Sequence, residues 1–368
     1  MKVLLAGGGT GGHILPTLAV AAALQNKQPG IELLYVGSRR PQDRELVEAA
    51  GIPFQAISAG KLRRYFALEN IADPFKFMRG VWEAGVILKR FRPQVVFAKG
   101  GYVSLPIVVA AGHLNIPVIV HESDSRLGRA NRWALRSATK LALAFPIEEC
   151  IKNSLIPESY RAKLVYTGLP IGRDLWEGSR EPLFHNGKPI VMISGGSQGA
   201  SAINDLVWGV LPQLANRYDL IHQVGEAHLS AATEQQQGLP ADLQNSYLPF
   251  GFDRQLHRRG LRLADLIVGR AGSSIFEFAV LGKPTILIPL PVKIGDDQIR
   301  NSRFIEQLGA AVVLDQNGLT SEKLLAAIDE LMTDTDKCKM IASQLAELGA
   351  KSREAAEAVA QLILSTVS

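Results

Sequence analysis

The sequence has few cysteines, and the two it has lie far apart, at Cys150 and Cys338. Neither belongs to a C-x-x-C or Cys/His pattern, so we expect ordinary thiols in a reducing cytosol rather than a metal or redox site. No apolar run approaches the ~18 residues that span a bilayer. Only four apolar residues separate Lys2 from the first glycine, so we expect neither a membrane span nor a secretory signal.

Net charge is also lacking over most of the chain. Of its 368 residues 47% are hydrophobic and 20% are charged, which is typical of a soluble globular protein of two domains. The net charge of +5 arises in residues 61–92, which hold eight basic and three acidic residues. Aromatic residues interleave with these charges, namely Tyr65, Phe66, Phe75, Phe77, Trp82 and Phe91. The segment suits either an anionic lipid surface or an amphipathic helix with its aromatics turned inwards. No basic groove continues it, so a nucleic-acid partner is not expected.

A predicted strand, glycine turn and helix open the chain. The apolar residues from Val3 end at Gly7-Gly8-Gly9-Thr10-Gly11-Gly12, and apolar residues then recur at helical spacing. Glycine permits positive φ and close backbone approach, and N–H groups at a helix start attract anions, so the turn predicts a phosphate or diphosphate site. His13 opens the helix, where its imidazole is biased towards the neutral, proton-accepting form.

The spacing of Gly7, Gly9 and Gly12 matches G-x-G-x-x-G, which alone is weak evidence for a dinucleotide. An NAD site also needs an acidic residue at the end of the second strand. The predicted strand 31–36 leads instead into Gly37-Ser38-Arg39-Arg40. The sequence therefore argues against NAD, whereas Arg39 and Arg40 leave an NADP-dependent reductase open. A P-loop is excluded because no G-x-x-x-x-G-K-[ST] occurs.

Two further polar turns are predicted at the same sheet edge. Strand 95–98 runs into Lys99-Gly100-Gly101-Tyr102-Val103-Ser104, and strand 118–120 runs into His121-Glu122-Ser123-Asp124. Ligands bind at the carboxyl ends of parallel strands, so these turns are expected to share one site. Short strands at 52–57, 141–144 and 164–166 complete this half, and Gly168–Gly172 is the predicted linker.

The second half repeats this opening. Strand 189–193 precedes Ser194-Gly195-Gly196-Ser197-Gln198-Gly199-Ala200, and a helix is predicted from Ile203 to Leu214. Strands follow at 220–224, 247–250, 266–268 and 285–289. Strand 266–268 leads into a turn where Ser273 or Ser274 can cap a helix that carries Glu277. That carboxylate suits either a ribose or the helix dipole. The expected loop 296–301 offers Gln298 and Asn301 to sugar hydroxyls. Helices 322–332, 339–348 and 352–366 end the chain.

Five motifs taken together resemble the MurG family, the bacterial glycosyltransferases that add N-acetylglucosamine to lipid I. They are G-G-G-T-G-G-H at 7–13, G-G-Y-V-S at 100–104, G-G-S-Q-G-A at 195–200, R-A-G-S-S-x-x-E at 270–277 and D-x-Q-x-x-N at 296–301. The resemblance implies a GT-B fold, an α/β architecture of two doubly wound Rossmann-like domains facing across a cleft. Residues 1–168 would bind acceptor and membrane, residues 169–349 would bind UDP-N-acetylglucosamine, and helix 350–368 would pack back on the first domain.

The same resemblance implies a role for individual residues, and it implies no cofactor. His13 is the expected base. The expected substrate contacts are Thr10, Gly11, Gly12, Asp124, Arg173, Ser197, Gln198, Phe252, Ser273, Ser274, Glu277, Gln298 and Asn301, and the acceptor contacts are Gly100, Gly101 and Tyr102. Membrane contacts are expected at Lys61, Arg63, Arg64, Phe75, Phe77 and Trp82. Asp124 stands where the family has asparagine, and Arg173 lies one place later than the family's arginine.

The implied reaction is an inverting transfer at the cytoplasmic face of the membrane, with lipid II as its product for peptidoglycan. His13 would take the proton of the attacking sugar hydroxyl. Helix N-termini and Arg173 would stabilise the departing UDP without metal. The metal-binding pattern D-x-D occurs at Asp334-Thr335-Asp336, but it is expected in a polar turn between two helices, far from the glycine turns.

Four alternatives remain at this point. Another GT-B enzyme, such as a diacylglycerol glycosyltransferase, would keep the fold and the donor site. A UDP-N-acetylglucosamine 2-epimerase would need no basic segment facing lipid. A non-catalytic membrane scaffold would not bind the nucleotide sugar, and an NADP reductase would bind nicotinamide.

Overall fold

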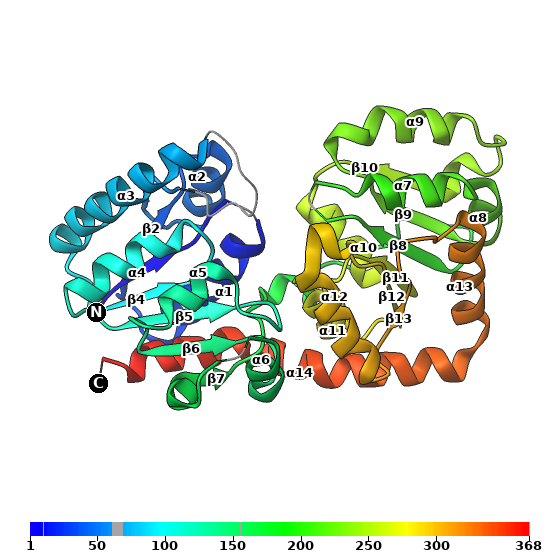
Figure 1. The fold of residues 1–368 in the computed structure, drawn as a ribbon. Helices are drawn as coiled ribbons and strands as arrows, with labels where there is room; N and C mark the ends of the chain where they lie inside the picture. Colours follow the sequence, from blue (N-terminus) through cyan, green and yellow to red (C-terminus); the bar gives the residue numbers. More distant parts are fainter. Residues whose placement is uncertain (10, 61–68, 155, 197, 368) are drawn as a thin grey trace. The chain divides into compact units, whose positions relative to one another are not determined.

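The computed structural model describes residues 1–9, 11–60, 69–154, 156–196 and 198–367. The chain divides into two compact units. Unit 1 consists of Met1–Gly172 together with Lys351–Ser368, and unit 2 consists of Arg173–Ala350. Each unit is built around one sheet of parallel strands (Figure 1). This confirms the predicted α/β class with two doubly wound sheets.

The sheet of unit 1 has seven parallel strands in the order β3-β2-β1-β4-β5-β6-β7. Their bounds are β1 (Lys2–Ala6), β2 (Glu32–Gly37), β3 (Phe54–Ala56), β4 (Val95–Ala98), β5 (Val118–Glu122), β6 (Lys140–Leu143) and β7 (Leu164–Tyr166). The chain reverses direction across the sheet between β1 and β4, which pair with Ala6 opposite Ala98. The turns that follow these two strands are therefore neighbours at the switch point, where doubly wound sheets bind ligands.

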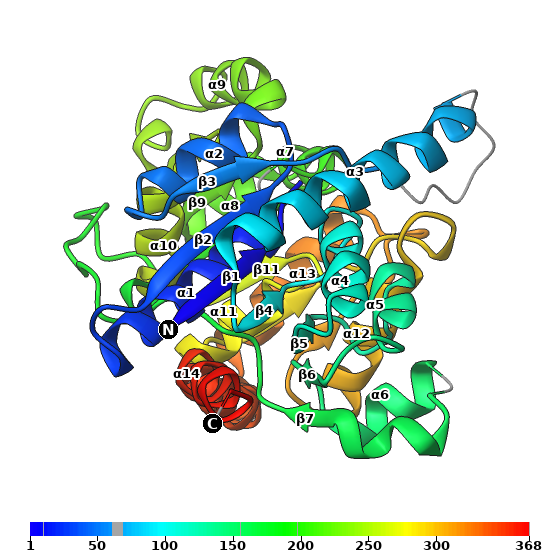
Figure 2. The ribbon, with the colours of Figure 1, turned by 90° about the vertical axis from the view of Figure 1, so that its left-hand side faces the viewer.

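The helices of unit 1 cover both faces of this sheet. They are α1 (Gly11–Lys27), α2 (Pro41–Glu48), α3 (Glu69–Phe91), α4 (Ser104–His113), α5 (Arg129–Ala134), α6 (Ile147–Ser154) and the short η1 (Glu158–Lys163). Helices α3, α4 and α5 lie in a row on one face (Figure 2). On the other face Ile14 and Leu24 of α1 share a buried core with Val359 and Ile363, near the end of the chain.

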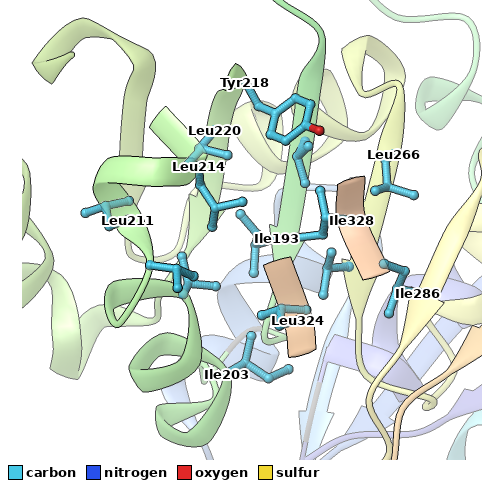
Figure 3. Packing of buried hydrophobic residues seen from close by; sticks show 14 of the residues in the cluster. Ile193, Ile203, Leu211, Leu214, Tyr218, Leu220, Leu266, Ile286, Leu324 and Ile328 are labelled. Atoms are coloured by element: carbon cyan, nitrogen blue, oxygen red, sulfur yellow. The ribbon is translucent and has the colours of Figure 1, made fainter. Parts of the chain in front are cut away.

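Unit 2 has six parallel strands in the order β10-β9-β8-β11-β12-β13. Their bounds are β8 (Ile190–Ser194), β9 (Asp219–Gln223), β10 (Tyr247–Phe250), β11 (Leu266–Gly269), β12 (Thr285–Leu287) and β13 (Val312–Val313). The helices are η2 (Arg173–Leu175), α7 (Ser201–Trp208), α8 (Leu211–Arg217), η3 (Glu226–His228), α9 (Leu229–Gln237), η4 (Gln244–Ser246), α10 (Arg254–Leu263), α11 (Ile275–Leu281), α12 (Val292–Gln307), α13 (Ser321–Thr333) and the first part of α14 (Thr335–Ser365). The rest of α14, from Lys351, belongs to unit 1. Ile203 of α7, Leu214 of α8 and Leu324 of α13 pack on Ile193 in the core of this unit (Figure 3).

The helix predicted over residues 203–214 is in fact two helices, α7 and α8, separated at Gly209 and Val210. Pro212 lies in the first turn of α8, where its missing N–H costs nothing. Inside one continuous helix, Pro212 would remove a hydrogen bond and its ring would clash with the preceding turn. The prediction of one helix is therefore wrong.

Two predictions in the last part of the chain are also wrong. Residues 296–301 lie in α12 rather than in a loop. The two helices predicted at 339–348 and 352–366 are one, α14. Gly349, which lies between the two predicted helices, lets α14 approach α11, because a Cβ there would lie 2.0 Å from the Ala279 carbonyl oxygen. The two-residue β13 was not predicted, since so short a strand carries no pattern.

No helix among the described residues is long and apolar enough to cross a membrane.

Candidate functional site

The first glycine turn, between β1 and α1, is held by the loop that follows β2. The Gly9 N–H donates to Asp43 Oδ2 at 2.9 Å, and the Ser38 hydroxyl donates to the same oxygen at 2.6 Å. From the other side, Arg40 donates to the Gly9 carbonyl oxygen at 2.6 Å. Gly9 has a φ of 87°, a conformation that glycine adopts at little cost. These contacts hold the backbone of Gly9 in place.

This arrangement uses the two arginines that had left an NADP site open. Arg40 is engaged with Gly9, and Arg39 pairs with Glu83 of α3 at 2.9 Å. Both guanidinium groups thus have protein partners. Asp43 was not identified as a site residue from the sequence, because its contact spans 34 positions.

The second glycine turn, after β4, interlocks with the first. Gly100 and Gly101 have φ values of 93° and 79°. A Cβ on Gly101 would lie 3.2 Å from His13 Nε2, and a Cβ on Gly9 would lie 2.9 Å from the Tyr102 hydroxyl oxygen. The structure thus brings His13, Gly101 and Tyr102 together at one sheet edge. Thr10, which belongs to the same turn as His13, lies outside the described residues.

His13 is a half-buried imidazole at the start of α1. Burial, with a smaller contribution from the charge of Lys99, lowers its pKa to about 4. Its Nδ1 is buried without a hydrogen-bond partner in the described part of the chain. The neutral, proton-accepting form expected from the sequence is therefore the form present at neutral pH. The main cause is burial, however, rather than the helix dipole.

The turn after β5 is organised by Glu122. Its carboxylate accepts four hydrogen bonds, from the N–H groups of Ser123, Asp124 and Gly128 at 2.9, 3.1 and 2.8 Å and from Asn131 Nδ2 at 2.9 Å. Glu122 is 5% exposed and fully engaged, so it holds the loop in place. Asp124 is half-buried in the turn that Glu122 fixes.

In unit 2 the turn after β8 packs closely on the turn after β9. A Cβ on Gly199 would lie 1.9 Å from the Val224 carbonyl oxygen, and a Cβ on Gly225 would lie 2.4 Å from the Gln198 carbonyl oxygen. The side of the turn at Gly196 is open, since a Cβ there meets no described atom within 4 Å. Gln198 is exposed on this turn. Ser197 lies outside the described residues.

The turn after β11 is held by side chains from other elements. Asn301 of α12 is fully buried and donates to the Ala271 carbonyl oxygen at 3.1 Å. Arg270 donates to the Ile288 carbonyl oxygen at 2.9 Å and to Gln316 at 2.6 Å. Asn301 therefore stabilises the turn from inside the protein. Its complete burial corrects the expectation that it contacts a sugar.

Ser274 precedes α11 but does not cap it. Its hydroxyl donates to the Arg270 carbonyl oxygen at 3.3 Å, so capping by Ser274 is corrected by the structure. Glu277, in the first turn of α11, has its Oε2 3.5 Å from His257 Nε2 of α10. Burial raises the pKa of Glu277, but the His257 hydrogen bond and the charges of His257, Arg258 and Arg254 outweigh it and hold the pKa below its usual range. Glu277 is therefore an ionised carboxylate.

The remaining donor candidates lie on separate elements of unit 2. Gln298 of α12 accepts from the Leu290 N–H at 3.1 Å. Phe252 is 57% exposed, and its N–H donates to Glu226 at 3.0 Å. Arg173 is exposed at the start of η2, and Ser273 is half-buried before α11.

An exposed apolar stripe runs along α3. Phe75, Met78, Trp82 and Val86 are 75%, 66%, 70% and 49% exposed and recur at helical spacing. Phe77, also expected to contact the membrane, is half-buried on a different side of the helix. Met78 and Val86 were not predicted from the sequence, because the prediction of membrane contacts considered only basic and aromatic residues. Lys61, Arg63 and Arg64 lie outside the described residues.

No group of three His, Cys, Asp or Glu side chains that suits a metal ion occurs in the described ranges. The D-x-D string lies where α13 ends and α14 begins, and Asp334 Oδ1 accepts from the Lys337 N–H at 2.9 Å. Asp334 thus begins a helix rather than joining a site.

Two doubly wound sheets, each with glycine turns at its carboxyl edge, are the architecture expected from the resemblance to GT-B glycosyltransferases. Comparison with known proteins agrees. The Glycosyltransferase family 28 N-terminal domain matches residues 3–143, and the Glycosyltransferase family 28 C-terminal domain matches residues 190–362. The chain belongs to glycosyltransferase family 28.

Individual relatives support this assignment. The UDP-N-acetylglucosamine--N-acetylmuramyl-(pentapeptide) pyrophosphoryl-undecaprenol N-acetylglucosamine transferase of Lachnospira eligens is 38% identical, across 90% of this chain and 91% of its own. The protein of the same name from Clostridium botulinum is 39% identical, across 90% of each chain. The crystal structure of Acinetobacter baumannii MurG has a TM-score of 0.74 and 28% identity, covering 99% of both chains. A structure described as a putative UDP-N-acetylglucosamine 2-epimerase from Listeria monocytogenes, at 14% identity and a TM-score of 0.72, shares the fold alone.

Proposed function

We propose that this protein transfers N-acetylglucosamine from UDP-N-acetylglucosamine to lipid I, giving lipid II for peptidoglycan. The acceptor is the C4 hydroxyl of the muramoyl sugar of undecaprenyl-diphospho-N-acetylmuramoyl-pentapeptide. The observation that carries the proposal is identity of 38–39% with enzymes named for this reaction, across nine-tenths of the chain. The two interlocked glycine turns and the neutral His13 of unit 1 supply a suitable acceptor site.

In this reaction the C4 oxygen forms a bond to the anomeric carbon while the bond from that carbon to the UDP oxygen breaks. Direct displacement inverts the anomeric centre. The hydroxyl proton goes to His13, which is neutral at the pH of the cell and sits at the lip of the acceptor turn. The departing UDP takes the bonding electron pair, and Arg173 with the turns of unit 2 stabilises its charge.

We assign the donor to unit 2. The ionised Glu277 suits the two hydroxyls of a ribose, since a carboxylate accepts hydrogen bonds from both. The turns bearing Ser197 with Gln198 and Ser273 with Ser274 contact the phosphates and sugar, and Gln298 contacts the transferred sugar. Phe252 presents its backbone to uracil. In unit 1, Thr10, Gly11 and Gly12 contact diphosphate, Gly100, Gly101 and Tyr102 contact the acceptor, and Asp124 adds a donor contact.

We assign membrane binding to α3. Its stripe of Phe75, Met78, Trp82 and Val86 is larger and more continuous than isolated exposed apolar residues on a soluble surface. Arg79 and Arg90 are exposed on the same helix. Apolar side chains flanked by arginine suit the boundary of an anionic bilayer. We therefore place the enzyme at the cytoplasmic face of the cell membrane as a peripheral protein.

Radiolabelled transfer tests the enzymatic proposal. The wild type should label a lipid I analogue and leave diacylglycerol unlabelled, and the transfer should persist in EDTA. His13→Ala should lower turnover by about 100-fold or more, the range of general-base catalysis. His113→Ala, at the exposed end of α4, serves as the matched control. Transfer to diacylglycerol, release of N-acetylmannosamine, or normal turnover of His13→Ala would each contradict the assignment.

Vesicle flotation tests the membrane surface. Met78→Ser should weaken binding to phosphatidylglycerol vesicles, whereas Met340→Ser should not. Met340 is a matched control because it is 54% exposed, but on α14 rather than α3. Equal binding of the two variants would refute the role of α3.

A further inference from the structure

Lys99 follows β4 and begins the second glycine turn. Its backbone N–H donates to the Ala6 carbonyl oxygen at 2.9 Å, so it lies where the ends of β1 and β4 meet. The residue is 1% exposed, yet its Nζ has no hydrogen-bond partner among the described residues. Lysine is almost never fully buried unless it is paired, because an unpaired buried charge is costly.

The charged groups around Lys99 leave its ammonium unpaired. Glu122, on the neighbouring β5, already accepts four hydrogen bonds from other donors. The charge of Asp124 raises the pKa of Lys99. The charge of Lys99 in turn lowers the pKa of His13 and of His121. Burial lowers the pKa of Lys99 to about 8, against the opposing effect of the two carboxylates. Lys99 is therefore still mainly protonated at neutral pH.

The two glycine turns beside Lys99 contact each other at two positions and leave Gly11 open. The turns pack on each other through Gly9 against Tyr102 and Gly101 against His13. At Gly11, by contrast, an added Cβ would meet no described atom within 4 Å. Glycine turns at a helix start suit phosphate groups, whose oxygens can supply the partner that Lys99 lacks.

We propose that Lys99 is the cation that binds the diphosphate of the lipid-linked acceptor between the two glycine turns of unit 1. This rests on the proposed function for the identity of the acceptor, although the anion site itself does not. In the absence of ligand the buried ammonium destabilises unit 1. When the acceptor binds, its diphosphate supplies the missing partner. Lys99 is thus retained for binding at the expense of stability.

Lys99→Met tests the proposal, because methionine nearly matches the length of lysine and removes its charge. The KM for a lipid I analogue should rise by about tenfold or more, since a lost charged hydrogen bond has that effect. The KM for UDP-N-acetylglucosamine should stay within about twofold, since the donor is assigned to unit 2. Lys140→Met is the matched control, because Lys140 begins β6 at the opposite end of the strands.

Thermal shifts separate a ligand-binding lysine from a structural one. Without ligand, the Tm of Lys99→Met should equal or exceed that of the wild type, because the variant relieves an unpaired buried charge. Farnesyl diphosphate, a short prenyl diphosphate, should raise the Tm of the wild type but not that of Lys99→Met. UDP should raise the Tm of both.

Two results would overturn the proposal. One is a lower Tm for Lys99→Met with an unchanged KM for the acceptor, which would make Lys99 structural. The other is a loss of the UDP shift with retention of the farnesyl diphosphate shift, which would place Lys99 at the donor. A wild type that shows the Lys99-dependent farnesyl diphosphate shift but transfers no sugar to lipid I would refute the proposed function and support the anion site.

Discussion

Gly199 offers a sharp test of how the donor turn of unit 2 is built. It has a φ of 74°, and a Cβ there would lie 1.9 Å from the Val224 carbonyl oxygen. In Gly199→Ala the left-handed backbone costs about 1–2 kcal/mol, and forcing a methyl group against packed backbone adds about 1–3 kcal/mol. We therefore expect the free energy of unfolding of unit 2 to fall by about 2–5 kcal/mol.

Two other glycines separate these effects. Gly187 has a φ of 75° and Gly196 a φ of 84°, and an added Cβ on either meets no described atom within 4 Å. Alanine at either position should therefore cost only the backbone term, about 1–2 kcal/mol. Gly196→Ala should also weaken UDP-N-acetylglucosamine binding, because its new methyl group projects from the donor turn into open space.

Urea unfolding followed by circular dichroism measures these differences, and the transition of unit 2 is the one that UDP shifts. Titration calorimetry gives the donor affinity of each variant. If Gly199→Ala is no less stable than Gly187→Ala, the close approach of the two turns is refuted. If Gly196→Ala binds the donor normally, the open side of the turn does not face the phosphates.

Four further predictions concern the residues of the site. Because the pKa of His13 is about 4, kcat/KM should stay level from about pH 5 to 7 and fall only near pH 4, and Lys99→Met should move that acid limb to higher pH. Protonation of His13 is disfavoured in the folded state, so about 3 kcal/mol of the free energy of unfolding should be lost as pH falls from 6.5 to 4, measurable by urea titration at each pH. Asp43→Ala leaves the Gly9 N–H and a hydroxyl without an acceptor and should lower the free energy of unfolding by about 2–4 kcal/mol in urea, whereas Asp43→Asn, which keeps an oxygen, should lose less. Glu277→Gln should raise the KM for UDP-N-acetylglucosamine by about tenfold with little change in Tm, and an unchanged KM would exclude Glu277 from the donor site.

Most of the fold could be predicted because its signals are local. The apolar runs of β1, β4 and β8 each lead into a glycine turn within two residues, and the bounds of β4 and β10 were predicted to the residue. The predicted helix bounds were wrong at one proline and one glycine, because each of these residue types can either interrupt a helix or have another role in it. Pro212 starts a helix instead of lying within one, and Gly349 permits close packing instead of ending a helix.

The site could be predicted only in part, because its supports come from distant parts of the chain. The glycine turns and His13 are visible as motifs. The hydrogen bonds from Gly9 to Asp43 and from Asn301 to Ala271 join residues that are distant in sequence, so no local pattern predicts them. Lys99 was not predicted for the same reason, since only the three-dimensional structure shows that its Nζ is buried without a hydrogen-bond partner among the described residues.

The shared core of unit 1 has a consequence for synthesis of the protein. Val359, Ala360 and Ile363 are fully buried against β1 and α1, although more than 300 residues separate them in sequence. All of unit 2 therefore leaves the ribosome before the nascent chain can complete the core of unit 1. Until then the apolar side chains that these three residues cover stay exposed to water, and a chaperone that shields them would favour correct folding.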